Sequence, residues 1–322
     1  MQPSLRVRSL TAVVPACFAL FLCLAQPTAQ AQAKAFMPAS LPEFVPIVEP
    51  GAPEDVRLPL PRRGEWLDAY RETDMTFLEY VSSDPLRASP ARRTIYLAPM
   101  GGIADARSLE ELKNFLSAFF CLPVRILEGG SPPREAYCAQ RGQYDGDEVL
   151  LSLSRSLPPD ALLAAALMDA DLYSGRLSAV FGLAYRDLRS CVISTARLWT
   201  DPRAARSAQE RVRFFKLVAH EICHVFGLAH SAAYEDLMNG TLSFNDLDRS
   251  PLLLSAPSLR KLRYSVGFDT LDRYERLDAF WQDFHYPQCA QALSPRLCRL
   301  RAQAARPRPL LPVELAVTRK KW

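Results

Sequence analysis

Three of the four histidines in this chain lie within eleven residues, in the stretch His220-Glu-Ile-Cys-His-Val-Phe-Gly-Leu-Ala-His230. His220 and His224 are four residues apart, so on a helix their imidazoles lie on one face and can bind the same metal ion. Gly227 allows the chain to leave the helix with a positive φ, and the turn then brings back His230 as a third ligand. Three imidazoles and one open position are typical of a catalytic zinc, because structural zinc sites are closed by four protein ligands.

Glu221 follows the first of these histidines, a position from which a carboxylate can act on water at the metal without being a ligand. HExxH alone occurs by chance in many proteins, and a single histidine on a helix is usually an ordinary core or surface residue. The extended pattern, with a glycine and a third histidine in register, is much harder to reach by chance. The stretch therefore predicts a zinc bound by His220, His224 and His230, with Glu221 as the catalytic carboxylate.

The sequence before the motif predicts a helix that carries it. Asp201-Pro202 is a helix start signal, and Ser207-Ala-Gln-Glu210 matches a capping box. Val218, Ile222 and Val225 fall on one apolar stripe, which leaves the histidines and Glu221 on another side of the helix.

Farther upstream, a β-rich run at residues 94–100 and an alternating run at 123–127 flank a helical pattern at 108–120. A strand, a helix and a second strand at this spacing form a βαβ unit with parallel strands and a right-handed connection. The apolar run 161–168 is predicted to be buried. Residues 179–185 and 190–196 predict a hairpin-like pair, which is either plain sheet core or includes an edge strand lining a substrate cleft.

The two ends of the chain differ from its middle. Residues 1–33 read as a signal peptide, with Arg6 and Arg8 before an apolar run and with small residues at possible cleavage sites (Ala29, Ala31 and Ala33). An uncleaved anchor is the alternative. We expect export to the periplasm or outside the cell, and no stable membrane insertion after cleavage, because no other segment is long and apolar enough to span a bilayer.

Composition sets further limits. The chain has 322 residues, 49% of them apolar and 23% charged, which is typical of a globular protein. Its net charge of +4 is too small to indicate nucleic acid or a membrane surface as a partner. We expect a Pro-rich segment at 34–92, a catalytic domain at 93–288 and an Arg- and Pro-rich tail at 289–322, loosely docked from Arg296 onward. The segment 34–92, with one helix predicted at Trp66–Val81, is a pro-piece, a linker or a packed collar. It contains no cysteine, so a thiolate plug on the zinc is excluded, whereas an acidic side chain could serve as one.

Six cysteines follow the leader, and an even number in an oxidising compartment favours disulfides, although six cysteines allow 15 pairings. The natural pairs are Cys121/Cys138 and Cys289/Cys298. Cys191 and Cys223 lie in apolar surroundings and read as buried free thiols.

Two other features could suggest metal binding. Asp169 and Asp171 form an acidic pair, which we interpret as a turn at a strand end because Asp is common there. His285 has no partner in any motif and is expected to be an ordinary surface or core residue. It follows an amphipathic helix predicted at Thr270–Phe284.

The stretch from about Thr94 to Phe268 resembles the archaemetzincins, a branch of the metzincin zinc peptidases. In metzincins a methionine turn lies beneath the zinc, and Met238 matches that position, where it would form an apolar floor and not a ligand. The resemblance implies an α/β (α+β) catalytic domain with a twisted mixed sheet, two main helices, a zinc helix and the methionine turn. It rests on Asp171-Leu-Tyr173, Val180-Phe-Gly-Leu-Ala184, Ser194-Thr-Ala-Arg-Leu198, the zinc helix with His230, and Leu237-Met238-Asn239.

The chain departs from this family at a second site. Archaemetzincins usually hold a structural zinc with four cysteines, and the matching positions here are Ser231, Asp236, Ala256 and Leu259. None of these can supply a thiolate, so we expect one zinc, the catalytic one, and no other cofactor.

The sequence thus predicts a secreted zinc metallopeptidase that hydrolyses peptide bonds with water activated at zinc and Glu221 as general base. Its partners would be peptide or protein substrates, and endopeptidase and aminopeptidase activities both remain open. One alternative is a zinc-bearing binding protein that has lost catalysis, which the intact Glu221 argues against. The other is a zinc hydrolase acting on a non-peptide bond.

Overall fold

The computed structural model describes residues 48–101, 106–175, 177–199 and 206–306. The expected signal peptide, the start signal Asp201-Pro202 and the last sixteen residues of the expected tail lie outside these ranges. Among the described residues, no helix is both long and apolar enough to cross a bilayer.

The main sheet has five strands in the order β2-β1-β5-β9-β8. The neighbours from β2 to β9 are parallel, and β8 runs antiparallel to β9 at one edge. The βαβ unit with parallel strands and the hairpin-like pair are therefore confirmed. The strands are β1 (Thr94–Met100), β2 (Val124–Ile126), β5 (Ala161–Met168), β8 (Gly182–Tyr185) and β9 (Ser190–Ser194).

A second, smaller sheet has the order β3-β4-β6-β7. The predicted run 179–185 divides between the two sheets, because the chain leaves β7 and enters β8 at Phe181, whose carbonyl accepts from Ser194 N. These strands are β3 (Tyr137–Cys138), β4 (Gln143–Asp145), β6 (Leu172–Ser174) and β7 (Leu177–Val180). A 3₁₀ turn, η1 (Arg134–Ala136), precedes them.

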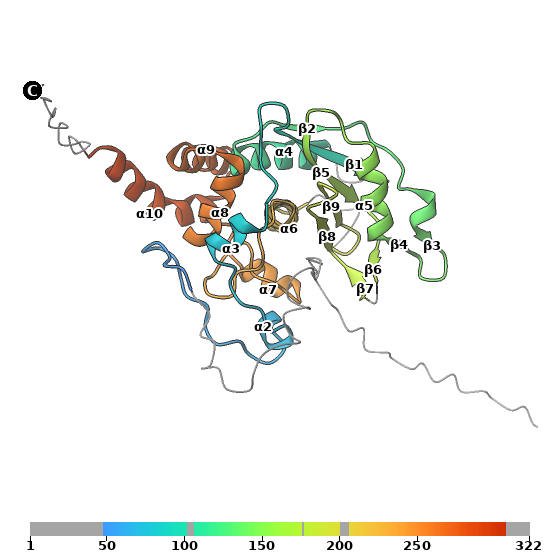
Figure 1. Ribbon diagram of the computed structural model, residues 1–322, viewed down its shortest axis with the longest axis horizontal. Helices are drawn as coiled ribbons and strands as arrows, with labels where there is room; N and C mark the ends of the chain where they lie inside the picture. Colours follow the sequence, from blue (N-terminus) through green and yellow to red (C-terminus); the bar gives the residue numbers. More distant parts are fainter. Residues whose placement is uncertain (1–47, 102–105, 176, 200–205, 307–322) are drawn as a thin grey trace, which may run out of the picture.

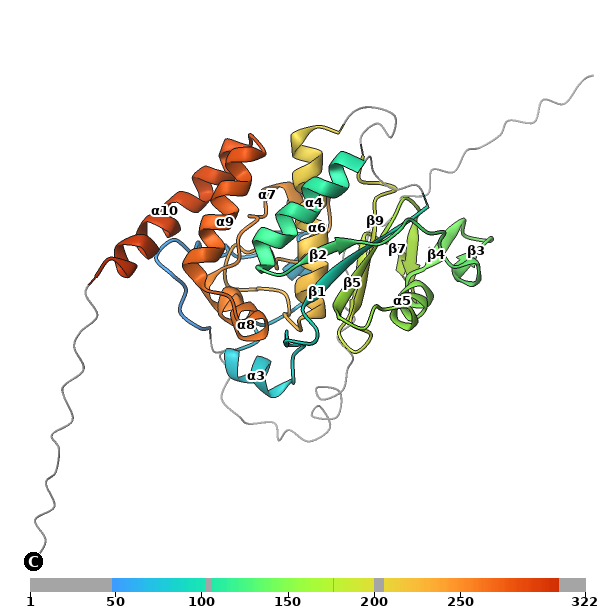
Figure 2. The same ribbon diagram turned by 90° about the horizontal axis from the view of Figure 1, so that it is seen from above.

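Both faces of the main sheet are covered by helices (Figures 1 and 2). Successive side chains of a strand point to opposite faces. On β5, Leu163, Ala165 and Leu167 join the core with α4 (Ala106–Phe120) and α6 (Ala208–Val225). The intervening Ala164, Ala166 and Met168 pack with α5 (Gly146–Arg155) on the other face. The all-apolar strand is thus buried on both faces, as its sequence predicts.

The C-terminal part of the described chain is helical, with α7 (Phe244–Arg249), α8 (Ala256–Val266), α9 (Thr270–Asp283) and α10 (Pro287–Ala304). Helix α9 confirms the predicted amphipathic helix and packs against α4. The structure is therefore of the mixed α/β class that the sequence predicts, with mixed sheets and the zinc-motif helix against the main sheet (Figure 2).

The single helix predicted at Trp66–Val81 is wrong. The structure has two short helices, α2 (Trp66–Ala69) and α3 (Phe77–Ser82), separated by an extended stretch. In that stretch, the carboxylate of Glu72 accepts a hydrogen bond from Trp66 Nε1 at 2.8 Å. Residues six apart on a straight helix are separated by about 9 Å along the axis, so this bond requires the helix to break. Thr76 then begins α3 with a capping box.

The prediction of a loosely docked C-terminal tail is also wrong for the part of residues 289–322 that the structure describes. Its boundary falls inside α10, and residues up to Ala304 are helical. Leu293 and Leu297 are buried in the main core, and Arg296 forms a buried ion pair with Asp55 at 2.6 Å. The apolar spacing of these leucines fits a packed helix face, and the Pro and Arg content of the segment concealed it.

The expected disulfides are not formed, because the six cysteines in the described parts of the chain are all free. Cys289 and Cys298 both belong to α10 and lie nine residues apart, which is about 13 Å along a helix and too far for a disulfide. Cys121 follows α4, whereas Cys138 belongs to the smaller sheet. Cys191 and Cys223 are buried free thiols, as predicted.

The ion pair between Asp55 and Arg296 gives the first prediction. The Asp55 side chain is fully buried and that of Arg296 is 8% exposed. Removing one charge of a buried pair leaves the other uncompensated, so Asp55→Asn should lower the free energy of unfolding by about 3 kcal/mol, measured by urea denaturation. As a control, Asp272→Asn disrupts the half-exposed pair with Arg276 and should cost less than about 1 kcal/mol. Equal losses in the two variants would contradict this assignment.

Candidate metal centre and active site

Helix α6 carries the first two histidines of the motif. Its N-cap, Ser207, accepts from Glu210 N while the Glu210 side chain accepts from Ser207 N, so the predicted capping box is present. The helix ends at Val225, and Gly227 follows with φ of 91°. The chain therefore leaves the helix through a glycine in the left-handed conformation, as the sequence predicts.

Backbone carbonyls fix the rings of His220 and His224. His220 Nδ1 lies 2.8 Å from the Leu237 carbonyl, and His224 Nδ1 lies 2.7 Å from the Leu228 carbonyl. Because a carbonyl can only accept, each Nδ1 carries the hydrogen and each Nε2 presents a lone pair. The two Nε2 atoms are 2.9 Å apart, so both lone pairs face the same small volume.

His230 returns to this volume from the loop after α6. Its Nδ1 lies 2.9 Å from a carboxylate oxygen of Glu72, and its Nε2 is buried without a hydrogen-bond partner. A buried, unpartnered ring nitrogen beside two others is the arrangement expected where a metal completes the bonding.

The three rings fit a zinc ion. One nitrogen from each ring belongs to a group whose members all lie within 4.8 Å of one another. Tetrahedral zinc with Zn–N bonds of 2.0–2.1 Å would separate its ligand nitrogens by about 3.4 Å, which small ring movements reach from this arrangement. It is the one such group of three or more His, Cys, Asp or Glu side chains found in the described parts of the chain.

Burial keeps the imidazoles of His220 and His224 neutral. Burial and the neighbouring His230 lower the pKa of His220 to about 3. Burial, followed by the charges of His220 and His230, also lowers the pKa of His224 well below its ordinary value. At pH 7 both rings can therefore offer a lone pair to a metal without first losing a proton.

Glu221 lies beside the histidines in a nearly water-free position. One of its carboxylate oxygens is buried without a hydrogen-bond partner, and burial raises the pKa of the carboxyl well above its usual range. The backbone of Gly182, in the edge strand β8, closely approaches this side chain. A Cβ atom at position 182 would lie 2.3 Å from Glu221 Oε1, so only glycine leaves room for the carboxylate.

Comparison of the sequence with known proteins agrees with this geometry. Residues 145–252 match the family model described as Matrixin (Peptidase_M10). The archaemetzincin of Archaeoglobus fulgidus is 31% identical over 170 residues, which cover 53% of this chain and 99% of that protein. Archaemetzincin-2 of Pongo abelii is 27% identical over 256 residues, which cover 66% of this chain and 71% of that protein.

The chain belongs to the archaemetzincin family. Among solved structures, the archaemetzincin of Archaeoglobus fulgidus complexed with malonate matches with 30% identity and a TM-score of 0.46, over 52% of this chain and 99% of that one. Family membership and the group of three histidines together make the chain a zinc metallopeptidase.

Three of the positions considered for a second zinc in the sequence analysis, Ser231, Asp236 and Ala256, make hydrogen bonds within the protein. Asp236 is fully buried, and its carboxylate accepts from Met238 N at 2.8 Å and from Ser255 N at 2.9 Å, and also from the Ser255 hydroxyl. Ser231 donates to the Tyr234 carbonyl, and Ala256 N donates to Asp55. Hydrogen bonds between protein groups thus occupy the polar atoms at these positions. Met238 itself is buried, next to the carbonyl that holds His220.

Glu72 and Trp66 are two site residues that the sequence did not reveal. Burial tends to raise the pKa of Glu72, but the hydrogen bond and charge of His230 and the hydrogen bond from Trp66 outweigh it and lower the pKa. The Trp66 ring lies edge-on to His230, with centroids 4.8 Å apart. Both residues fall in a Pro-rich segment whose spacing suggested a plain helix, so no local signal marked them.

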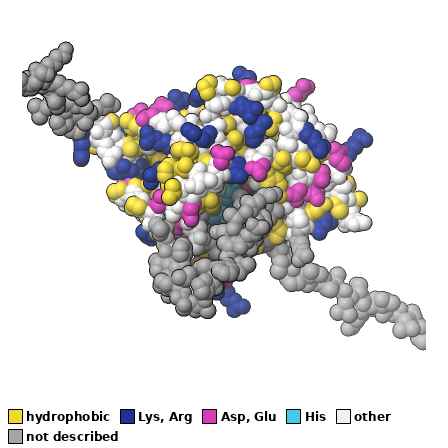
Figure 3. All heavy atoms as spheres, viewed as in Figure 1, with side chains coloured by type: hydrophobic (Ala, Val, Ile, Leu, Met, Phe, Trp, Pro, Cys, Tyr) yellow, Lys and Arg dark blue, Asp and Glu magenta, His cyan; other side chains and the backbone are white. Residues whose placement is uncertain are grey.

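The other polar candidates lie outside the group of three histidines. Asp171 forms an ion pair with Arg197 beyond the end of β5. His285 is exposed and lies just after the C-cap of α9, with φ of 56°. On the face seen in Figure 3, basic and acidic side chains of the described residues are interspersed, without a continuous basic tract.

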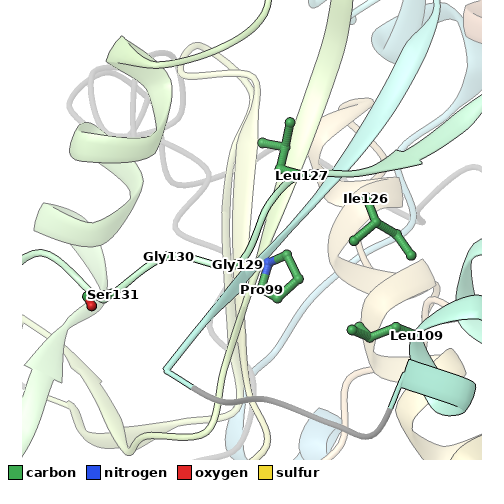
Figure 4. Close-up of a pocket in the computed structure, with 7 residues that line it drawn as sticks. All are labelled: Pro99, Leu109, Ile126, Leu127, Gly129, Gly130 and Ser131. Carbon is green, nitrogen blue, oxygen red and sulfur yellow. The ribbon is translucent and has the colours of Figure 1, made fainter.

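A separate hollow of about 540 Å³ lies where β1 and β2 end (Figure 4). Its walls are Pro99, Leu109, Ile126, Leu127, Ser131 and two glycines. Among the described residues that line it, none is a histidine, a cysteine or a carboxylate.

The convergence of the rings gives a prediction for metal content. His224→Ala should leave the purified protein without bound zinc after dialysis, because two imidazoles cannot replace the lost ligand. His285→Ala, which changes the exposed histidine outside the group, should keep the wild-type zinc content. Elemental analysis measures both, and full retention of zinc by His224→Ala would refute the assignment.

Proposed function

We propose that the protein is an exported peptidase with a single catalytic zinc held by His220, His224 and His230. The observation that carries this proposal is the convergence of three buried imidazoles, each bonded through Nδ1, beside a buried and unpartnered Glu221 oxygen. A purely structural metal site has no need of that carboxylate. The positions that would hold a second zinc carry no cysteine, which supports a count of one.

When bound, zinc would lower the pKa of a water molecule toward about 7 and polarise the carbonyl of the peptide bond. Glu221 would take the proton of this water as the water attacks the carbonyl carbon, and would then give the proton to the leaving amine. Burial of Glu221 favours the first of these steps, since a raised pKa makes the carboxylate a stronger base. Met238, buried in the loop that holds His220, would form an apolar floor beneath the rings.

Strand β8 is the element best placed to hold a peptide substrate. It is an edge strand of the main sheet, and its first residue, Gly182, abuts Glu221. A peptide that added to this edge as a further strand would bring its backbone close to the catalytic carboxylate. Export is supported by the charged and apolar leader at residues 1–33.

The first test separates metal binding from catalysis. Glu221→Ala should keep one zinc per chain but reduce peptide cleavage by about 100-fold to 10,000-fold, the range typical for a lost general base. Mass spectrometry of a complex peptide mixture, incubated with the wild-type protein and with the variant, measures cleavage and its specificity together. If the wild type holds zinc but cleaves no peptide, the protein is instead a binding protein or a hydrolase of another bond.

A second test concerns Gly182. Gly182→Ala would place a Cβ atom where the Glu221 carboxylate lies, so the carboxylate must move while the three histidines keep their carbonyl and carboxylate partners. We expect unchanged zinc content and a loss of peptidase activity of about 100-fold or more. Gly129→Ala is the control, since nothing lies within 4 Å of a Cβ at that position. Normal activity in Gly182→Ala would show that Glu221 does not act from this position.

A further inference from the structure

Each of the three imidazoles depends on an acceptor at Nδ1, and the third acceptor differs in kind from the other two. His220 and His224 donate to the backbone carbonyls of Leu237 and Leu228, which belong to the motif and the loops that follow it. His230 donates to Glu72, a carboxylate 158 residues earlier in the chain. One of the three rings is therefore oriented by a charged side chain from the Pro-rich N-terminal segment.

The carboxylate contacts the outer nitrogen of His230. An acidic plug would have to reach the open side of the metal, where the Nε2 atoms converge. Glu72 Oε2 instead lies 2.9 Å from Nδ1, and His230 Nε2 stays without a hydrogen-bond partner. This is the geometry of a group that holds a ligand in place, in contrast to that of an inhibitor.

Glu72 is itself held in place. Trp66 Nε1 donates to the same carboxylate oxygen at 2.8 Å, and the buried Trp66 ring packs edge-on to His230. Gly240 makes room for this ring, because a Cβ atom there would lie 2.4 Å from three Trp66 atoms. The lack of a side chain at Gly240, two residues after Met238, thus allows Trp66 of the N-terminal segment to pack there.

The same segment holds the loop of His230 from both ends. Before the loop, Tyr80 donates its hydroxyl hydrogen to the Phe226 carbonyl at 2.9 Å. After it, Ala232 N donates to Asp74 at 3.1 Å. Trp66 and Tyr80 are buried in the main core, so the segment packs as part of the body of the molecule.

We propose that Glu72 is a positioning residue for the metal site and that residues 48–92 are a permanent part of the active enzyme, not an inhibitory pro-piece. The carboxylate fixes the tautomer of His230 and increases the basicity of its Nε2. This inference rests on the proposed function, because it requires His230 to bind zinc.

The experiment compares full-length Glu72→Gln, Glu72→Ala and Trp66→Phe with the wild type. The matched control is Glu79→Gln, on α3 of the same segment, where the capping box accepts Gln as well as Glu. Zinc affinity is measured by competition with a chelator, and the visible absorption spectrum of the Co²⁺-substituted protein reports the ligand geometry. Circular dichroism checks that each variant is folded.

We expect Glu72→Gln and Glu72→Ala to bind zinc about 10-fold to 100-fold more weakly and to change the Co²⁺ spectrum. Trp66→Phe, which removes the donor to Glu72 but keeps an aromatic ring, should give a smaller change in the same direction. Glu79→Gln should match the wild type in both measurements. Peptidase activity should fall in the Glu72 variants.

Two outcomes would overturn the inference while the wild type binds one zinc. Wild-type zinc affinity and spectrum in both Glu72 variants would show that the carboxylate does not position the ligand. Faster peptide cleavage by Glu72→Ala would show that the residue inhibits the enzyme. If the wild type itself binds no zinc, the proposed function fails, and this inference fails with it.

Discussion

The site depends on one constraint: a straight helix can direct two histidines four residues apart at one metal ion, but the third ligand must come from irregular chain. Irregular chain does not hold a ring in place by itself, because its backbone lacks the repeating hydrogen bonds of a helix. Here hydrogen bonds at Nδ1 supply the missing rigidity for all three rings. The loops after α6 supply two of the acceptors through their backbone carbonyls, and Glu72 of the N-terminal segment supplies the third.

The main sheet provides the support for this arrangement. β5 is buried on both faces, and α6 packs against β8 and β9 and, through Phe215, against Trp281 of α9. Side chains of α6 from Val212 to Val225 belong to the main core, which fixes the depth and rotation of the helix. On the other side of Glu221 lies the edge strand β8, where Gly182 has no side chain and so leaves room for the carboxylate.

Much of this arrangement could be predicted from sequence because it is local. The spacing of His220, His224 and His230, the capping box at Ser207 and the apolar run of β5 are short-range patterns with direct physical meaning. Glu72 could not be found in this way, since its contact with His230 spans 158 residues and has no periodic signature. The same holds for Gly182, whose role depends on a side chain packed against it from α6. The disulfides were wrongly predicted for a related reason: close spacing in sequence does not place two cysteines of one helix within bonding distance.

The ion pair of Asp55 with Arg296 joins positions 241 residues apart, almost the full described length of the chain. During synthesis, which proceeds from the N-terminus, Asp55 is made long before its partner in α10. The N-terminal segment therefore gains this anchor only when the last described helix has been completed. A contact between residues so far apart in sequence also carries a larger entropic cost of loop closure than a local contact does. The N-terminal end of the described chain is thus tied down by its most C-terminal described helix, a contact that forms only after α10 has been synthesised.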